Sequence, residues 1–205
     1  RGEPGAGIVS EPAGPAEAEP PSSGRPAVAA GVEVVVEDDQ SDQPVDVDRW
    51  ARLATYALTR LGVERGELSL TFVDEATIAE LNADHMGEDG PTDVLSFPMD
   101  AAPDDDGPTP APGSLGAQVP VLLGDVVVCP AVAARNAADH AAGAAEPHPG
   151  HPTHDGSLDA ELALLVVHGV LHVLGHDHAE PDETAAMHAA ERDVLAGFAA
   201  LEGAR

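Results

Sequence analysis

The sequence predicts an α+β fold, in which a small mixed β-sheet and packed helices surround a central helix that carries histidines. The expected elements follow the order β-α-β-α-β-β-α-α-α, which suggests a small mixed sheet with helices packed on it. Residues 162–174 are apolar nearly all round, as in a helix buried at the centre of a domain. The chain has 205 residues, enough for one domain with a core and additional tails.

The chain is expected to begin with a disordered tail. Residues 1–30 are acidic and rich in Pro, Ala and Gly, so they bury too little apolar surface to offset the entropy of ordering. A single domain is expected over residues 31–203. The β-branched run Val32–Val36 predicts its first strand. Apolar residues recur at helical spacing from Trp50 to Leu61, which predicts the first helix.

The middle of the chain predicts two strands around a short helix. Apolar and polar residues alternate over residues 68–72, as in a half-buried strand. Asp74 can cap a short helix that contains Ile78. The Gly-Pro-Thr-Asp sequence at residues 90–93 predicts a turn, and it leads into a strand at residues 94–98.

Two low-complexity loops are expected, near residues 101–118 and 143–156. Between them, residues 121–129 predict a strand, and Pro130 suits the first turn of a helix that continues to about Ala142. The second loop contains His148, His151 and His154, for which adventitious metal affinity or plain solvation is expected rather than a dedicated site.

Two further helices are expected at the C-terminal end. Ser157 can cap the apolar helix, whose first turn contains acidic residues that suit the helix dipole. The last helix begins near Pro181. Its apolar stripe consists of Met187, Ala190, Val194, Phe198 and Leu201.

The charge of the chain is strongly negative. The formal net charge is −28, no lysine is present, and such a surface repels nucleic acid at low salt. Two explanations stay open: a surface adapted for solubility, and a salty cytoplasm that screens the charge. The one cysteine, Cys129, favours a reducing compartment and therefore the cytoplasm. No apolar run reaches the roughly 18 residues of a membrane span.

Residues 168–178 contain four of the ten histidines and predict a metal site. His168 and His172 are four residues apart, so they project from one face of a helix. Gly175 can end that helix, and it favours His178 over His176 as the third ligand. Three imidazoles suit one Zn²⁺ ion with an open fourth position. Asp177 is a candidate to orient a ligating imidazole.

The histidine spacing is shared with the metzincin proteases, but one residue differs. In those enzymes the position after the first histidine is a glutamate that acts as the general base. Here that position is Gly169. This difference disfavours a zinc peptidase.

Two sequence blocks resemble the YbeY family of bacterial rRNA maturation factors, which are metal-dependent single-strand endoribonucleases. One block is His-Gly-Val-Leu-His-Val-Leu-Gly-His-Asp-His at residues 168–178, and the other is Gly-Pro-Thr-Asp-Val-Leu-Ser-Phe-Pro at residues 90–98. Weaker support comes from Leu81-Asn82, Gly124-Asp125 and Glu161-Leu162.

The resemblance implies a site, a substrate and partners. His168, His172 and His178 are then the zinc ligands, and the strand that contains Thr92, Asp93 and Ser96 lines the substrate groove. Members of the family process ribosomal RNA, notably the 3′ end of 16S rRNA, and take part in ribosome quality control. They work with small-subunit ribosomal proteins and an assembly GTPase.

Two departures from the family pattern stand out. Many members carry a functional arginine a few residues before the Thr-Asp block, where this chain has Met86 beside His85. Arg135 is a candidate substitute for the missing cation. The second departure is His176, where members often have tyrosine.

The resulting expectation is phosphodiester hydrolysis, in which zinc lowers the pKa of a bound water and polarises a phosphoryl oxygen. His176 and Asp177 are the candidates for proton transfer. The expected substrate is single-stranded ribosomal RNA, with no role for DNA or a membrane. An alternative is a non-catalytic ribosome-assembly factor with a structural zinc.

Overall fold

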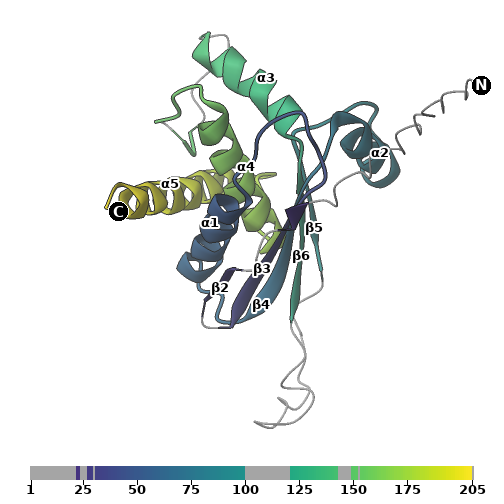
Figure 1. Cartoon of the computed structure of the whole chain (residues 1–205). Coiled ribbons are helices and arrows are strands. Elements are labelled where there is room, and N and C mark those ends of the chain that lie inside the picture. Colours follow the sequence, from purple (N-terminus) through teal and green to yellow (C-terminus); the bar gives the residue numbers. More distant parts are fainter. Residues whose placement is uncertain are drawn as a thin grey trace, which may run out of the picture.

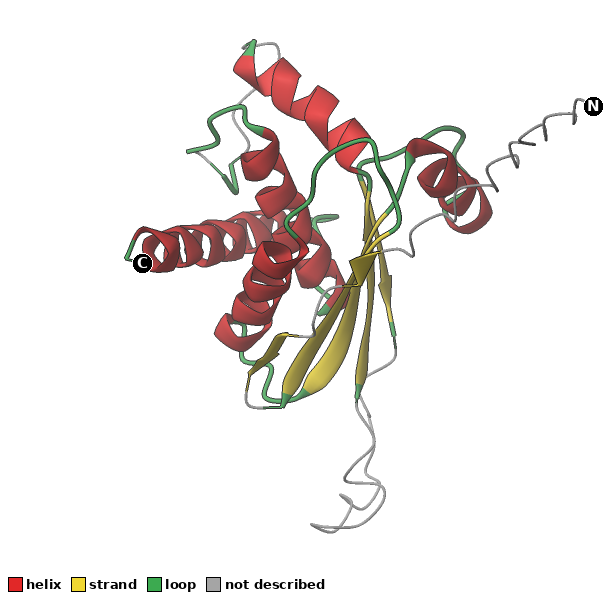
Figure 2. Cartoon of the chain, viewed as in Figure 1, coloured by secondary structure: helices red, strands yellow, loops and turns green. Residues whose placement is uncertain are grey.

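The computed structural model of the chain describes residues 22–23, 27–29, 31–99, 121–142, 149–151 and 153–204. A mixed sheet and five helices in this part confirm the predicted α+β class (Figure 1; Figure 2). The expected loop at residues 101–118, part of the loop at residues 143–156 and most of the expected tail at residues 1–30 lie outside the described residues.

Four strands form the centre of the sheet. Their order across it is β3 (Val32–Asp38), β4 (Gly66–Phe72), β6 (Leu122–Val128) and β5 (Val94–Pro98). β3, β4 and β6 run parallel, whereas β5 forms an edge and runs antiparallel to β6. Thr92 and Asp93 directly precede β5, so the Thr-Asp block lies at an edge of the sheet, next to β6.

Two short strands were not predicted. β1 (Ser22–Ser23) and β2 (Ala27–Ala29) pair antiparallel with the other side of β3, inside the segment expected to be a disordered tail. Their pairing uses main-chain hydrogen bonds, which require no apolar side chains. A sequence of small residues gives no periodic signal for such pairing.

Helices α1 (Val47–Arg60) and α4 (Leu158–Val173) pack on one face of the sheet, and α5 (Pro181–Gly203) lies on the same side (Figure 1). The main core fills the space between them. Eleven residues of α4 are buried, which confirms the predicted central helix. Helix α3 (Pro130–Ala141) packs against α4 and begins with its proline, as expected.

A smaller apolar cluster lies on the other face of the sheet. Because successive strand residues point to opposite faces, Val126 and Val128 enter the main core while Val127 enters this cluster. Ile78 of α2 (Glu75–His85) covers it. Cys129 is also buried there, and burial raises the pKa of its thiol, as expected for a structural cysteine.

No helix in the described part of the chain is both long enough and apolar enough to cross a membrane.

Candidate metal centre

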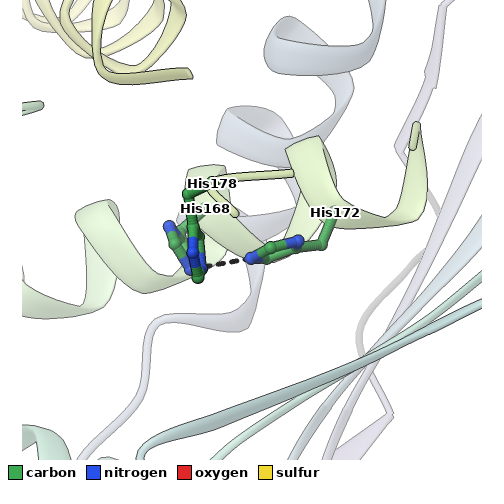
Figure 3. A group of neighbouring side chains, drawn as sticks. All are labelled: His168, His172 and His178. Carbon is green, nitrogen blue, oxygen red and sulfur yellow. Dashed lines mark hydrogen bonds between the residues drawn. The ribbon is translucent and has the colours of Figure 1, made fainter. Parts of the chain in front are cut away.

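Three histidines gather at the C-terminal end of α4. His168 and His172 project from one face of the helix, one turn apart (Figure 3). The helix ends at Val173 with Leu174 as its C-cap, and Gly175 adopts a φ of 83°, a left-handed conformation that suits glycine. The chain then turns back and brings His178 against the other two rings (Figure 3). The structure thus places the three predicted ligands together.

The spacing of their nitrogens fits one zinc ion. The Nε2 atoms of His168 and His172 lie 3.1 Å apart, and one ligand atom from each histidine lies within 4.8 Å of the others. Tetrahedral ligands at zinc–nitrogen distances of ~2.0–2.1 Å are separated by about 3.3 Å. Among the described residues, no fourth His, Cys, Asp or Glu joins this group. The donor set therefore fits a three-histidine site with an open position.

A buried carboxylate orients the first histidine. Nδ1 of His168 lies 2.9 Å from Oε1 of Glu191, whose side chain has no exposed surface. Gly150 lies so close that a side chain there would overlap the Glu191 carboxylate. Since a carboxylate accepts hydrogen bonds, the His168 proton belongs on Nδ1, and the lone pair on Nε2 faces the other histidines. Glu191 has the role that the sequence suggested for Asp177.

The environment of His172 favours the neutral ring. Burial lowers its pKa below the ordinary value of 6.5, and positive charge on His168 and His178 lowers it further. A hydrogen bond with the backbone of His176 and the charge of Asp177 oppose these effects. Because only a neutral imidazole binds a metal, this environment prepares His172 as a ligand.

His176 and Asp177 belong to the loop between the helix and the third ligand. The backbone N–H of His176 donates to the Leu171 carbonyl, which closes the helix end. The exposed Asp177 carboxylate accepts the backbone N–H of His178 at 2.7 Å. Asp177 therefore orders this loop, because its carboxylate is hydrogen bonded to the backbone of His178, the third predicted metal ligand.

Gly169 lies where α4 touches the sheet. A Cβ at this position would lie 2.5 Å from Cγ1 of Val126 and 3.2 Å from Oγ of Ser96. Any larger side chain would force the helix away from the sheet. In the metzincins a glutamate stands at the position of Gly169. Here Val126 and Ser96 of the sheet fill the space that its side chain would need.

A family model described as "Endoribonuclease YbeY" matches residues 35–199. This range includes β4, β5 and β6, all three histidines and Glu191. The chain belongs to the YbeY endoribonuclease family. The membership agrees with the resemblance of the two sequence blocks, which the fold places on β5 and α4.

Curated relatives of the family cover most of the chain. An "Endoribonuclease YbeY" of Thermobifida fusca is 45% identical over 78% of this chain and 90% of its own length. One of Clavibacter sepedonicus is 44% identical over 82% of this chain and 97% of its own. A solved structure from Thermotoga maritima is similar with a TM-score of 0.47 and 20% identity, over 82% of this chain and 92% of that one.

The YbeY-like block on β5 is tied to α3. The carboxylate of Asp93 accepts hydrogen bonds from the Val94 backbone N–H at 2.9 Å, the Thr92 hydroxyl at 3.2 Å and the Asn136 side chain at 2.9 Å. Ser96 is half-buried and faces Gly169. Asp93 also borders a pocket that includes His168, so this end of the strand lies beside the metal centre.

Arg135, the candidate substitute for the missing cation, does not line this pocket, and neither do Met86 and His85. Arg135 of α3 forms a bidentate ion pair with Glu75 of α2, with Nη2 3.0 Å from Oε2, and it does not line the pocket. This pairing raises the pKa of Arg135 and lowers that of Glu75. Met86, where the resemblance implies an arginine, is 48% exposed at the end of α2. The neighbouring His85 ring packs on Phe97.

A second histidine cluster was missed by the sequence analysis. His140 of α3 and His154 both contact Oε2 of Glu161, a buried residue of α4, at 3.1 Å and 2.9 Å. The solvated interpretation of His154 was wrong, because its side chain is only 4% exposed. The signal that could have revealed it is Glu161 itself, a carboxylate on a helix that is apolar nearly all round.

Proposed function

We propose that this chain is a zinc-dependent, single-strand-specific endoribonuclease that acts in 16S rRNA 3′-end maturation and ribosome quality control. One observation supports it most: three histidines with an open position, in a chain of the YbeY endoribonuclease family. Membership of the family supports the endoribonuclease activity, and we propose zinc as the metal and 16S rRNA as the substrate.

The residues around the site prepare it to hold a divalent ion. His168, His172 and His178 would hold one Zn²⁺, which when bound lowers the pKa of a coordinated water and polarises a phosphoryl oxygen. Glu191 holds the His168 ring so that its Nε2 lone pair faces the site. Burial lowers the pKa of His172, which favours the neutral ring that a metal ion needs.

Proton transfer is proposed for the loop that carries the third ligand. His176 is half-buried and Asp177 is exposed, and both are within two residues of His178. Of the two, we favour His176 as the proton acceptor, because the Asp177 carboxylate already accepts the His178 backbone N–H. Asp177 then has an indirect role, because its hydrogen bond to the His178 backbone helps to position that metal ligand.

The proposed substrate residues have different roles. Asp93 borders the pocket beside His168, and Thr92 hydrogen bonds to Asp93. Ser96 supports the close approach of α4 to the sheet. Arg135 could meet a phosphate only by leaving Glu75, an exposed pair worth little stability.

The proposed setting is the cytoplasm, with single-stranded ribosomal RNA as substrate and with small-subunit ribosomal proteins and an assembly GTPase as partners. DNA is not an expected substrate. The chain has a net charge of −28 and therefore repels anionic RNA. Docking onto ribosomal proteins is one route by which it can reach that RNA.

Two competing functions are disfavoured by specific observations. A structural zinc is usually held by four protein ligands, whereas the group in the described residues has three. A zinc peptidase needs a general base after the first histidine, and Val126 occupies the space above Gly169.

The test is cleavage of single-stranded RNA by the purified, zinc-loaded chain over a range of salt. His172→Ala should abolish cleavage and zinc binding. His188→Ala, a half-buried histidine of α5 outside both histidine clusters, is the matched control and should retain both. RNA cleavage that is equal in the wild type and His172→Ala would contradict the proposal.

A further inference from the structure

A pocket of about 330 Å³ lies between the metal centre and the second histidine cluster. His168 forms one side of it and His140 of α3 the other, with Glu161 between them along α4. A substrate whose phosphate reaches the three histidines can therefore extend into this pocket. Its volume is at the small end of the range for ligand pockets, about 300–1,000 Å³.

The protons of the second cluster can be placed from its hydrogen bonds. The Gly156 backbone N–H donates to Nδ1 of His154 at 3.0 Å, so the neutral His154 ring carries its proton on Nε2. That nitrogen lies 2.9 Å from Oε2 of Glu161, although the ring is not aligned for a linear hydrogen bond. His154 thus offers Glu161 a proton rather than a lone pair.

The same carboxylate determines the state of His140. Nδ1 of His140 lies 3.1 Å from Oε2 of Glu161 and donates to it, because a carboxylate can only accept. The lone pair of the neutral His140 ring is then on Nε2. Glu161 orients His140 much as Glu191 orients His168.

One face of α3 presents hydrogen-bond acceptors to the pocket. Asn136, Asp139 and His140 are spaced three and four residues apart and all line it. The Asn136 amide donates to Asp93, which leaves its side-chain oxygen as an acceptor. Asp139 is exposed and offers a carboxylate. The pocket is therefore built for a ligand that donates hydrogen bonds.

The remaining wall is apolar. Val94 of β5 and the buried Leu164 and Leu165 of α4 contribute to the lining. A flat, uncharged ring could pack on these side chains while its edge donates hydrogen bonds to α3.

Two other ligand classes fit less well. Among the described residues, no lysine or arginine lines the pocket, and Asp93 and Asp139 would repel a phosphate. A second metal ion would need a lone pair on Nε2 of His154, where the hydrogen bond from Gly156 places a proton. In the described residues, Asp93 and Asp139 belong to neither group of side chains that could hold an ion.

We propose that this pocket binds the base of the nucleotide next to the phosphate at the three histidines, and that it favours a base with an exocyclic amino group. Cytosine presents an amino donor where uracil presents a carbonyl oxygen, so the acceptors on α3 distinguish them. The inference rests on the proposed ribonuclease function, because it assumes that RNA reaches the three histidines.

The first experiment measures base binding without cleavage. Cytidine and uridine are titrated into the ¹⁵N-labelled, zinc-loaded chain, and amide shifts of Asn136 and Leu165 are followed by NMR. One good hydrogen bond predicts that cytidine binds about fivefold more tightly than uridine. Asp139→Asn should reduce the difference to less than about twofold, because an amide is a weaker acceptor than a carboxylate. Asp84→Asn, on the exposed surface of α2, is the matched control and should retain it.

The second experiment maps cleavage in an unstructured RNA that contains only cytidine and uridine. The wild type should cut next to cytidine, Asp139→Asn should lose that preference, and the control Asp84→Asn should retain both the preference and the total rate.

The possible outcomes distinguish a failure of the proposed base pocket from a failure of the proposed ribonuclease activity. Cytidine binding without RNA cleavage would support the base pocket and contradict the ribonuclease. Cleavage with no base preference, together with equal shifts for both nucleosides, would overturn the pocket and leave the ribonuclease. A second bound zinc that His154→Ala removes would also overturn the pocket, because it would assign the cluster to a metal.

Discussion

Nδ1 of His168 lies 2.9 Å from Oε1 of Glu191, a carboxylate with no exposed surface, although the two residues are on different helices. The contact joins α5 to the ligand-bearing face of α4. It fixes which nitrogen of His168 faces the other two histidines, and so links the packing of the C-terminal helix to the chemistry of the site.

Glu191→Gln should weaken zinc binding about 10–100-fold, because an amide holds the His168 ring less strongly than a carboxylate does. Zinc affinity is measured by competition with a chromophoric chelator. Glu80→Gln, an exposed residue of α2, removes the same charge and should leave the affinity unchanged. Equal affinities in the wild type and Glu191→Gln would show that the contact does not orient the ligand.

Gly169→Ala should destabilise the fold by ~1–3 kcal/mol, because its Cβ would overlap Val126 and push α4 from the sheet. Urea unfolding measures the change. Val126→Ala opens space at the same contact, so the double variant should lose less stability than the two single losses combined. Additive losses would indicate that the two side chains do not compete for this space.

The metal-free chain should lose stability as the pH falls below about 6.5. Burial lowers the pKa of His172 in the folded state, so below its ordinary value the unfolded chain binds more protons. This contribution is absent above pH 6.5 and grows as the pH falls towards the lowered pKa. Urea unfolding of the wild type and His172→Gln from pH 8 to pH 5 measures it. Relative to the wild type, His172→Gln should gain free energy of unfolding as the pH falls. A difference between the two proteins that does not change with pH would contradict the lowered pKa of His172.

Met86→Arg should strengthen RNA binding and steepen its dependence on salt, because it adds a cation where the resemblance implies an arginine. Met86 is 48% exposed, so the fold should tolerate the change. One added phosphate contact changes the slope of log affinity against log salt by about −0.7 for a single strand. Leu201→Arg adds the same charge at a position of α5 that is 51% exposed. If both variants change the slope equally, the effect is one of net charge alone.

Local patterns predicted most of the elements and the metal ligands. The alternation at residues 68–72 and the apolar run that ends at Leu174 were confirmed as β4 and α4. The spacing of His168 and His172, with Gly175 after them, was enough to predict a shared metal site. These features depend on neighbours in the chain, whose geometry is set by the helical repeat and by the left-handed conformation of glycine.

The residues that the sequence analysis missed act across long separations. Glu191 is 23 residues from His168, and Glu161 is 21 residues from His140. In the sequence each is one of 37 acidic residues, and most of those suit a solvated surface. Only helix packing shows which carboxylates are buried against a histidine.

The sequence by itself determined the α+β class, the central apolar helix and the three histidines, because these follow from periodicity and from side-chain chemistry. The tertiary structure decided which carboxylates orient those histidines, why Gly169 allows no larger side chain, and where α3 and α4 leave a pocket. These properties depend on the distance between elements far apart in the chain, and that distance is set by the packing of the whole core.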